Sequence, residues 1–282
     1  MLQPGALAVS VRFSYTNTSL RELEPGTIAE LDVEQFHPTV AVEYGVSRRL
    51  QLGAELPVLY SWEGFLDPLI QWVEKGTGNL RFVRKTQPIN GFRYVLEKNG
   101  ETLIDVKRGD AGLGDLIIKA KGLLVEESTL WPAVSVRAAV KLPTGELDRG
   151  LGSGHADVGV GLLLGKRWGP VGASLLGEWM RPLGNSFAGT GISVGSWWTG
   201  TFTMDVKMTD RLSIFGLLRR VGSPYRGGLR LLNRTIWETA AGLNIAFSRE
   251  THLQIGFVEE LFESAEVSSD ITLFVNMIAY RF

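Results

Sequence analysis

Hydrophobic and polar residues alternate with a period of two along most of this chain. The clearest example is Asp270–Phe282, in which Leu273, Val275 and Met277 alternate with residues of the opposite face. A period of two predicts a β-strand, because successive side chains of a strand point to opposite faces. The carboxy-terminal segment is therefore predicted to be a strand.

The same alternation recurs in further segments, so the sequence predicts about twelve strands. The more polar face of these segments is rich in Gly, Ser, Thr and charged residues. Such a face suits a water-lined lumen better than a packed soluble core. The predicted strands span residues 6–18, 39–46, 50–60, 112–124, 132–142, 156–164, 171–180, 197–208, 212–221, 236–247, 253–261 and 270–282.

Short and long connections alternate between the predicted strands. This arrangement, with an even number of strands of about ten residues, is typical of outer-membrane barrels. The predicted fold class is therefore all-β, a transmembrane antiparallel β-barrel of about twelve strands with both termini in the periplasm. A soluble barrel or two-sheet sandwich is the alternative. The short connections lie near 47–49, 126–131, 165–170, 209–211 and 248–251, and the long ones near 19–38, 61–111, 143–155, 182–196, 222–235 and 262–269.

The long connection 61–111 is predicted to carry a short helix and a β-hairpin. Its Asn99-Gly100 dipeptide lies between two alternating runs and is a strong hairpin signal. An apolar helical stripe on an extracellular loop must be buried, as a lid in the barrel mouth or at the lipid interface on the rim. A simple loop cap is the third possibility. The predicted lid residues recur at helical spacing: Phe65, Leu66, Leu69, Ile70 and Val73.

Composition narrows the class of protein. The 282 residues carry a net charge of -1 and no Cys, which argues against a nucleic-acid footprint, disulfides and thiolate metal sites. The sequence has no apolar run of about 18 residues, so no transmembrane helix is predicted. Residues 1–282 are predicted to form a single outer-membrane barrel domain with 61–111 as an insertion. No signal peptide is visible, and we expect a leader to have been removed before Met1.

Aromatic residues fall near both ends of the predicted strands, as in the girdles at the two membrane interfaces. Tyr280 and Phe282 end the last strand and resemble the assembly signal of bacterial outer-membrane barrels. Expected partners are thus the bilayer with its outer-membrane lipid, and the barrel-assembly machinery through these two residues. The outer group is Tyr15, Tyr60, Trp62, Trp179, Trp197, Trp198 and Trp237, and the inner group is Tyr44, Trp168, Phe247, Tyr280 and Phe282.

Charged residues on the inward face are the candidate pore lining. Twelve strands lie between filled eight-stranded barrels and open porins, so the lumen is a narrow channel or is plugged. Lys119, Lys121 and Arg137 should lie at similar depth and could concentrate anions, with Glu55 neutralising one of them. Structural pairing of opposite charges is the competing interpretation. The pore-lining candidates are Arg12, Glu43, Glu55, Asp115, Lys119, Lys121, Arg137, Lys141, Asp205, Lys207, Arg219 and Glu238, with Asp157 and Glu178 on the same face.

Catalysis is weakly supported by the sequence. Ser153, His155 and Asp157 lie close together, but alternate positions on one face of a strand do not stack a triad end to end. His37 and His155 on outer loops could share a metal, yet a third ligand is not defined. We therefore predict no enzyme, no cofactor and no metal.

Three stretches resemble a group of uncharacterised bacterial outer-membrane barrels, which are similar in turn to the barrels encoded with meta-pathway phenol degradation. The resemblance covers roughly residues 50–170 and the terminal strand, and its motifs are structural. It implies passage of small, often aromatic or amphipathic compounds. The stretches are GLGDLIIKAK at 112–121, VKLPTGE at 140–146 and ADVGVGLLLGKRW at 156–168, together with the loop sequences SWEGFLDPLIQWVEK and NGFRYVLE.

Together these features predict a bacterial outer-membrane channel for passive passage or uptake of small molecules. Its selectivity would come from Lys119, Lys121, Arg137 and Lys141 against Glu43 and Glu55, with the helix modulating access. A lipid-modifying acyl hydrolase or transferase is one alternative. A closed structural or partner-binding barrel is the other.

Overall fold

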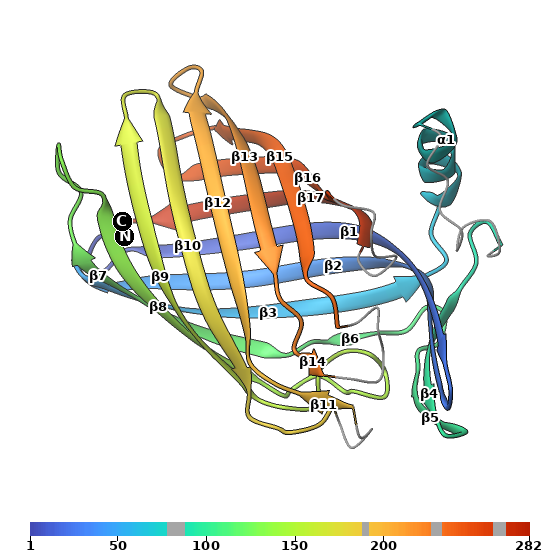
Figure 1. Ribbon diagram of the computed structural model, residues 1–282. Helices are drawn as coiled ribbons and strands as arrows, with labels where there is room; N and C mark the ends of the chain where they lie inside the picture. The colour runs from blue at the N-terminus through green and yellow to red at the C-terminus, as the bar shows by residue number, and fades with distance from the viewer. Residues whose placement is uncertain (78–87, 188–191, 227–232, 262–268) are drawn as a thin grey trace.

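Antiparallel strands form a closed ring in this computed structural model, which describes residues 1–77, 88–187, 192–226, 233–261 and 269–282. Within these residues twelve long strands make the wall, and the ring closes because β1 pairs with both β2 and β17. The predicted all-β barrel of about twelve strands is confirmed (Figure 1). The wall strands are β1 (Leu7–Glu24), β2 (Thr27–Ser47), β3 (Leu50–Trp62), β7 (Leu116–Val125), β8 (Ala133–Leu142), β9 (Asp157–Trp168), β10 (Val171–Pro182), β12 (Trp197–Lys207), β13 (Leu212–Val221), β15 (Ile236–Ala246), β16 (Thr251–Glu260) and β17 (Ser269–Arg281).

The two ends of the barrel differ. Both termini lie side by side at the end that carries the short turns, where Leu7 pairs with Arg281 (Figure 1). The longer connections lie at the other end. The predicted connection 262–269 falls almost wholly outside the described residues, as do parts of 61–111, 182–196 and 222–235.

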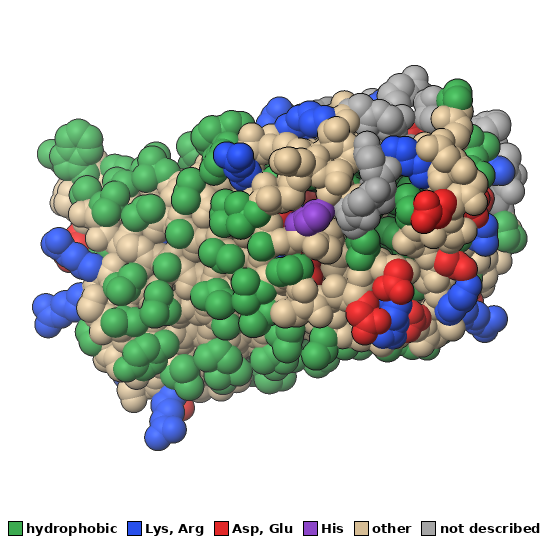
Figure 2. Space-filling model, turned by 90° about the horizontal axis from the view of Figure 1, so that it is seen from below, with side chains coloured by type: hydrophobic (Ala, Val, Ile, Leu, Met, Phe, Trp, Pro, Cys, Tyr) green, Lys and Arg blue, Asp and Glu red, His purple; other side chains and the backbone are tan. Residues whose placement is uncertain are grey.

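The outer surface of the wall is an apolar band. Side chains such as Val40, Leu162 and Phe202 are exposed, whereas the charged residues in view gather at the two ends (Figure 2). Trp198 at the long-loop end and Trp168 at the short-turn end are also exposed. A closed barrel leaves no unpaired strand edge, so the band can face hydrocarbon. Such a surface is typical of a barrel that spans a membrane.

The shorter elements lie in the connections. The loop after β3 contains α1 (Asp67–Thr77) and the hairpin of β4 (Arg93–Lys98) and β5 (Glu101–Asp105), as predicted. Asn99 and Gly100 have φ angles of 51° and 81°, the backbone of a type I′ turn. No described helix has the length and apolarity needed to cross a membrane. The remaining short strands are β6 (Ala111–Leu113), β11 (Ser193–Val194) and β14 (Tyr225–Arg226).

The prediction of a long polar connection at 19–38 was wrong. Strand β1 continues to Glu24 and β2 begins at Thr27, and the two pair in unbroken register from Leu7–Tyr44 to Glu24–Thr27. The hairpin therefore projects well beyond the wall. Strand β4 adds to the edge of β2 and β5 to β4, which makes a four-stranded sheet of the β1–β2 projection and the β4–β5 hairpin. We call this the lid sheet, because it bends across the long-loop end of the barrel (Figure 1).

Candidate pore and its lid

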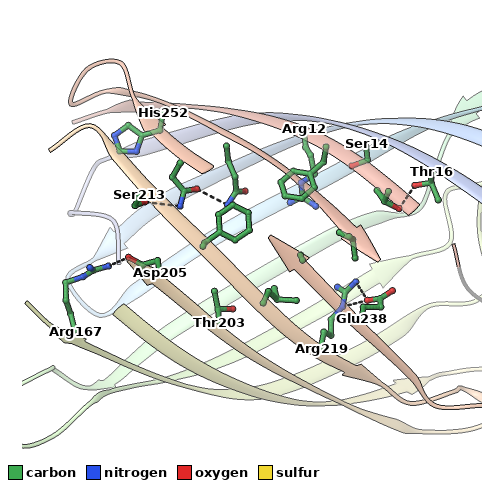
Figure 3. Close-up of a pocket in the computed structure, with 18 residues that line it drawn as sticks. Arg12, Ser14, Thr16, Arg167, Thr203, Asp205, Ser213, Arg219, Glu238 and His252 are labelled. Atoms are coloured by element: carbon green, nitrogen blue, oxygen red, sulfur yellow. Dashed lines mark hydrogen bonds and ion pairs between the residues drawn. The ribbon is translucent and has the colours of Figure 1, made fainter. Parts of the chain in front are cut away.

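A cavity of about 760 Å³ lies inside the barrel. It is lined mainly by inward positions of β1, β12, β13, β15, β16 and β17, and most of its labelled side chains are polar (Figure 3). The alternation of each strand sends these residues inward and their apolar neighbours to the lipid. The lining includes Arg12, Ser14, Thr16, Thr203, Asp205, Ser213, Phe215, Arg219, Glu238, Asn244, His252, Gln254 and Phe274.

Most charged groups of this cavity are paired. Arg219 and Glu238 are register partners on β13 and β15, and Arg219 Nε donates to Glu238 Oε2 at 2.6 Å. Arg167 reaches Asp205 at 2.7 Å across the intervening strand β10. That bridge passes over Gly172, where an added Cβ would lie 2.4 Å from the Asp205 carboxylate and 2.6 Å from the Arg167 guanidinium. A residue larger than Gly would therefore displace the Asp205 carboxylate or the Arg167 guanidinium from its present position.

A second group of paired charges follows β3, β7, β8 and β10. Lys119 Nζ lies 2.6 Å from Glu55, and Arg137 lies 3.4 Å from Glu178. Lys121 and Arg137 are register partners, so the predicted common depth of these cations is observed. The pair formed by Lys119 and Glu55 matches the neutralisation expected from the sequence.

A third group lies nearer the long-loop end. Lys141 Nζ contacts Asp157 at 2.6 Å and Asp115 at 3.2 Å. The Asp115 carboxylate also accepts the backbone N–H groups of Gly145 at 3.0 Å and Ser153 at 3.1 Å. Lys141 thus ties the loop between β8 and β9 to the wall, so its charge is not free to select solutes.

Arg12 differs from these cations. It projects into the cavity from β1 (Figure 3), and within the described part of the chain no ion pair or hydrogen bond to its guanidinium is found. Two rings also line the cavity, Phe215 and Phe274, whose centroids lie 6.3 Å apart. The cavity therefore combines one unmatched positive charge with an aromatic pair.

The remaining predicted pore residues lie elsewhere. Glu43 accepts a hydrogen bond from Gln51 at 2.8 Å and lines a smaller cavity with Lys119, Lys121 and Arg137. Lys207 lies at the short-turn end and pairs with Asp210 at 2.8 Å, on the surface.

Sequence reasoning missed several lining residues. Arg167 falls in the short connection predicted near 165–170, but β9 continues through it to Trp168. Phe215 and Phe274 were on the inward face by alternation, yet aromatic residues in a lumen give no pattern of their own. Asn244 connects Ser213 at 3.2 Å with Gln254 at 3.0 Å. The inward alternation of β13, β15, β16 and β17 could have identified Phe215, Asn244, Gln254 and Phe274.

An apolar core closes the long-loop end. Leu20 and Ala29 from the inward face of the β1–β2 projection pack with β4–β5 and with Ile192 from the β10–β12 connection. Leu147, Phe187 and Tyr225 from three loops of the opposite wall cover this core. The lid sheet is thus held by contacts with loops that are distant in sequence. The buried members are Leu20, Ala29, Leu96, Ile104, Val106 and Ile192.

Two tyrosines bring polar atoms into the lid. Burial raises the pKa of Tyr94, and burial followed by the proximity of Tyr94 and Asp157 raises the pKa of Tyr225 to about 12. Near neutral pH both phenols remain neutral and stay compatible with the apolar core. At the edge of the lid the Arg149 guanidinium holds the pKa of Asp110 below its usual range by hydrogen bonding.

The helix predicted as a lid lies on the other face of the β1–β2 projection. Leu66 N donates to Glu34 Oε1 at 2.6 Å, and Asn17 donates to both Glu34 at 3.1 Å and Asp67 at 3.0 Å. Asn17 and Glu34 are register partners, and their side chains point to the outer face of the hairpin. Phe13 on β1 and Val40 on β2 point to the same face and are exposed on the lipid side. Of the predicted lid residues, Leu66 is buried and Ile70 partly buried, whereas Phe65, Leu69 and Val73 are exposed.

The geometry around Ser153 does not form a hydrolytic triad. The Ser153 hydroxyl donates its one proton to the backbone carbonyl of His155 at 3.2 Å and is contacted by Lys141 Nζ. The Asp157 carboxylate is held by Lys141, and His155 Nε2 lies 2.5 Å from the carbonyl of Ser186. A nucleophile needs its proton directed at a base, so these contacts do not support acyl transfer. Among the described residues no group of three or more potential metal ligands is found.

The end of the last strand is ordered by aromatic stacking. Tyr280 and Phe282 lie 6.2 Å apart with an interplanar angle of 8°, and Tyr280 packs edge-on against His252 at 5.4 Å. Recognition of these rings by assembly machinery stays a prediction.

Three solved structures share this fold. The chain is similar to the COG4313 outer membrane channel from Pseudomonas putida F1, with a TM-score of 0.66, 13% identity, and coverage of 100% of this chain and 97% of that one. The NanC porin gives a TM-score of 0.55 at 7% identity, covering 97% and 100% of the two chains. The KdgM porin gives 0.50 at 6% identity, covering 98% and 99%. All three are channels or porins, and at such identities the likeness concerns the fold.

Sequence comparison extends the resemblance seen in residues 50–170 to nearly the whole chain. No curated protein sequence matches it significantly. One family matches residues 2–282. The chain is therefore a bacterial outer-membrane barrel that belongs to the family described as Protein of unknown function (DUF3187).

Proposed function

We propose that this barrel is a passive channel for small solutes, with a preference for anions and for compounds that carry an aromatic or amphipathic group. The observation that carries the proposal is the internal cavity of about 760 Å³ into which Arg12 projects without a counter-charge among the described residues. Passage would follow the concentration gradient and need no cofactor.

The charge pairs argue for Arg12 as the selecting group. A carboxylate lies within 3.2 Å of each of the cations Lys119, Lys141 and Arg219. Its negative charge reduces the electrostatic potential that the cation adds to the lumen. An unmatched cation in a confined space with low-dielectric walls attracts counter-ions more strongly than it would in water. Selectivity is thus assigned first to Arg12 and second to Lys121, which pairs with no carboxylate within 4.0 Å in the described residues.

The rest of the lining supports the second half of the proposal. Phe215 and Phe274 offer ring faces and edges to a passing aromatic group. Asn244 and Gln254 supply amide groups beside them. A solute with a carboxylate and a ring could contact both kinds of group within one cavity.

Entry from outside is proposed to depend on the lid sheet rather than on α1. The apolar core beneath the sheet spans the long-loop end of the barrel, and polar solutes do not cross such a core while it is packed. A channel of this design conducts when the contacts of Leu20 with Ile192 and with the other loops of the opposite wall open.

The selectivity is tested by an Arg12→Glu variant, refolded and inserted in a planar bilayer with asymmetric KCl. We expect wild-type current to reverse at an anion-selective potential and the variant to shift toward cation selectivity. Arg48→Glu makes the same charge change at an exposed turn and is the matched control. Equal shifts in both variants, or none in either, would remove Arg12 from the selective role.

A closed structural barrel is the second candidate, and the packed lid core favours it. It predicts no conductance even after the lid core is disrupted. This outcome separates it from the channel.

A further inference from the structure

The helix α1 has an inverted distribution of side chains. Its carboxylates Asp67 and Glu74 are buried, with 3% and 8% of their surface exposed, whereas Leu69, Trp72 and Val73 are 55%, 72% and 49% exposed. A helix that borders water shows the opposite arrangement, with its apolar stripe toward the protein. The exposed face of α1 therefore suits an apolar medium.

The helix is held firmly on the β1–β2 projection. Glu34 is 1% exposed and accepts hydrogen bonds from Tyr15 and from the backbone N–H of Leu66. Gly64, with a φ of 73°, lies so close to Glu34 that an added Cβ would be 1.9 Å from its carboxyl carbon. The loop that leads into α1 is thus fitted to this surface, and the exposed face is fixed in orientation.

An aromatic row connects α1 with the lipid-facing wall. Phe13 stacks on Phe36 at 5.9 Å, Tyr15 stacks on Phe65 at 5.3 Å, and Trp62 meets Phe65 edge-on at 6.2 Å. Phe13 lies on the exposed outward face of β1. The apolar outward surface of the wall thus continues as far as Phe65, two residues before α1, and Phe65 is itself 59% exposed.

We propose that α1 lies in the outer leaflet of the outer membrane, with Phe65, Leu69, Trp72 and Val73 embedded at the boundary between headgroups and acyl chains. Interfacial helices bury their apolar face to this depth, and Trp is enriched there. The occupant of this surface is lipid. The α1 loop and the lid core pack on opposite faces of the β1–β2 hairpin. Contact of α1 with lipid would therefore also hold the lid sheet in place from its outer side.

The absence of Cys permits a direct test by single-site labelling. A Trp72→Cys variant carries an environment-sensitive fluorophore in phosphatidylcholine vesicles that contain a nitroxide either high or low on the acyl chain. We expect the label to be quenched, and more strongly by the shallow nitroxide. Val40→Cys on the wall is the positive control, and Glu101→Cys in the β4–β5 turn is the solvent control.

All three positions are exposed, so labelling should not prevent folding. Quenching at position 72 no greater than at position 101 would overturn the proposal. A blue-shifted but unquenched label would do so as well, because it would indicate cover by a second copy of the chain. Either result is independent of whether the lumen conducts.

Discussion

The barrel wall and the lid sheet share strands β1 and β2, but polar and apolar residues exchange faces between them. In the wall, β1 sends Arg12 and Thr16 inward and Phe13 outward. Past residue 17 the pairing register continues unbroken, yet the inward face carries Leu20 and the outward face carries buried Ser19. The difference shows that alternation fixes which side a residue faces, whereas the neighbouring medium decides which residue type belongs there.

The medium changes at the membrane boundary. In the wall the inside is an aqueous cavity and the outside is lipid, so polar residues point inward. Beyond the wall the inside is a protein core built with loops of the opposite side, and the outside is covered by the α1 loop. One hairpin thus lines the cavity of the barrel at one end and forms a packed cover at the other.

The largest expected effect comes from a charge in the lid core. Leu20 is 1% exposed, and Leu20→Asp would put a carboxylate among apolar side chains, which costs about 2–5 kcal/mol. We expect amide hydrogen exchange in the lid sheet to become much faster while exchange in the wall is unchanged. The control is Leu23→Asp, on the same strand but 59% exposed. Equal exchange in both variants would contradict a packed lid.

The polar network of the wall should respond less strongly to a single change. Lys141→Met removes the cation shared by Asp115 and Asp157 and leaves two carboxylates close together. We expect a loss of about 1–3 kcal/mol in the free energy of unfolding, measured by urea titration in detergent micelles. Adding Asp157→Asn should recover part of the loss. No change in either variant would show that the network is not structural.

Alkaline pH should destabilise the lid but not the barrel wall, because Tyr225 packs in the lid. Its pKa is about 12 in the folded lid against an ordinary 10.0, so the stability from the neutral phenol is complete below pH 10 and is lost as the pH rises toward 12. We expect lid amides to lose protection across this window, and Tyr225→Phe to weaken that pH dependence. The chain has six Tyr residues, so the pKa of Tyr225 is obtained from the difference between the ultraviolet titrations of wild type and Tyr225→Phe. A midpoint near 10 at this residue would contradict its burial.

The smallest effect is expected at the tip of the β4–β5 hairpin. Gly100 has a φ of 81°, so Gly100→Ala should cost about 0.5–1 kcal/mol in the lid sheet. Gly177→Ala is the matched change in the wall, where φ is ordinary and an added Cβ meets no atom within 4 Å. Hydrogen exchange of β4–β5 should report only the first change. An effect of Gly177→Ala on that hairpin would indicate coupling that the structure does not contain.

The wall could be predicted because the alternation that defines each strand lies within the sequence of that strand. Each strand places lipid-facing and lumen-facing residues alternately, as in Val134, Val136 and Val140 against Arg137. Lys119 and Glu55 could be matched because the short turns of a meander bring neighbouring strands together. These steps need no knowledge of distant segments.

The lid could not be predicted because its partners are far apart in the chain. Leu20, Ile104 and Ile192 come from distant parts of the chain and share one apolar core, and no local sequence pattern connects them. Residues 19–38 nonetheless contained a signal: Ala29, Leu31 and Val33 alternate with carboxylates after a Pro-Gly turn. In the wall, polar residues point inward and apolar residues point outward. In this part of β2 the apolar residues point inward instead, so the pattern expected of a wall strand did not identify it.

The central claim, a solute-selective lumen closed by a packed lid, is tested most directly by single-channel recording of wild type beside Leu20→Asp and Leu23→Asp. We predict rare or small openings in wild type and in Leu23→Asp, and frequent, larger, anion-selective currents in Leu20→Asp. Silence of all three proteins at every voltage, with the barrels shown to be inserted, would contradict the channel and favour a closed structural barrel.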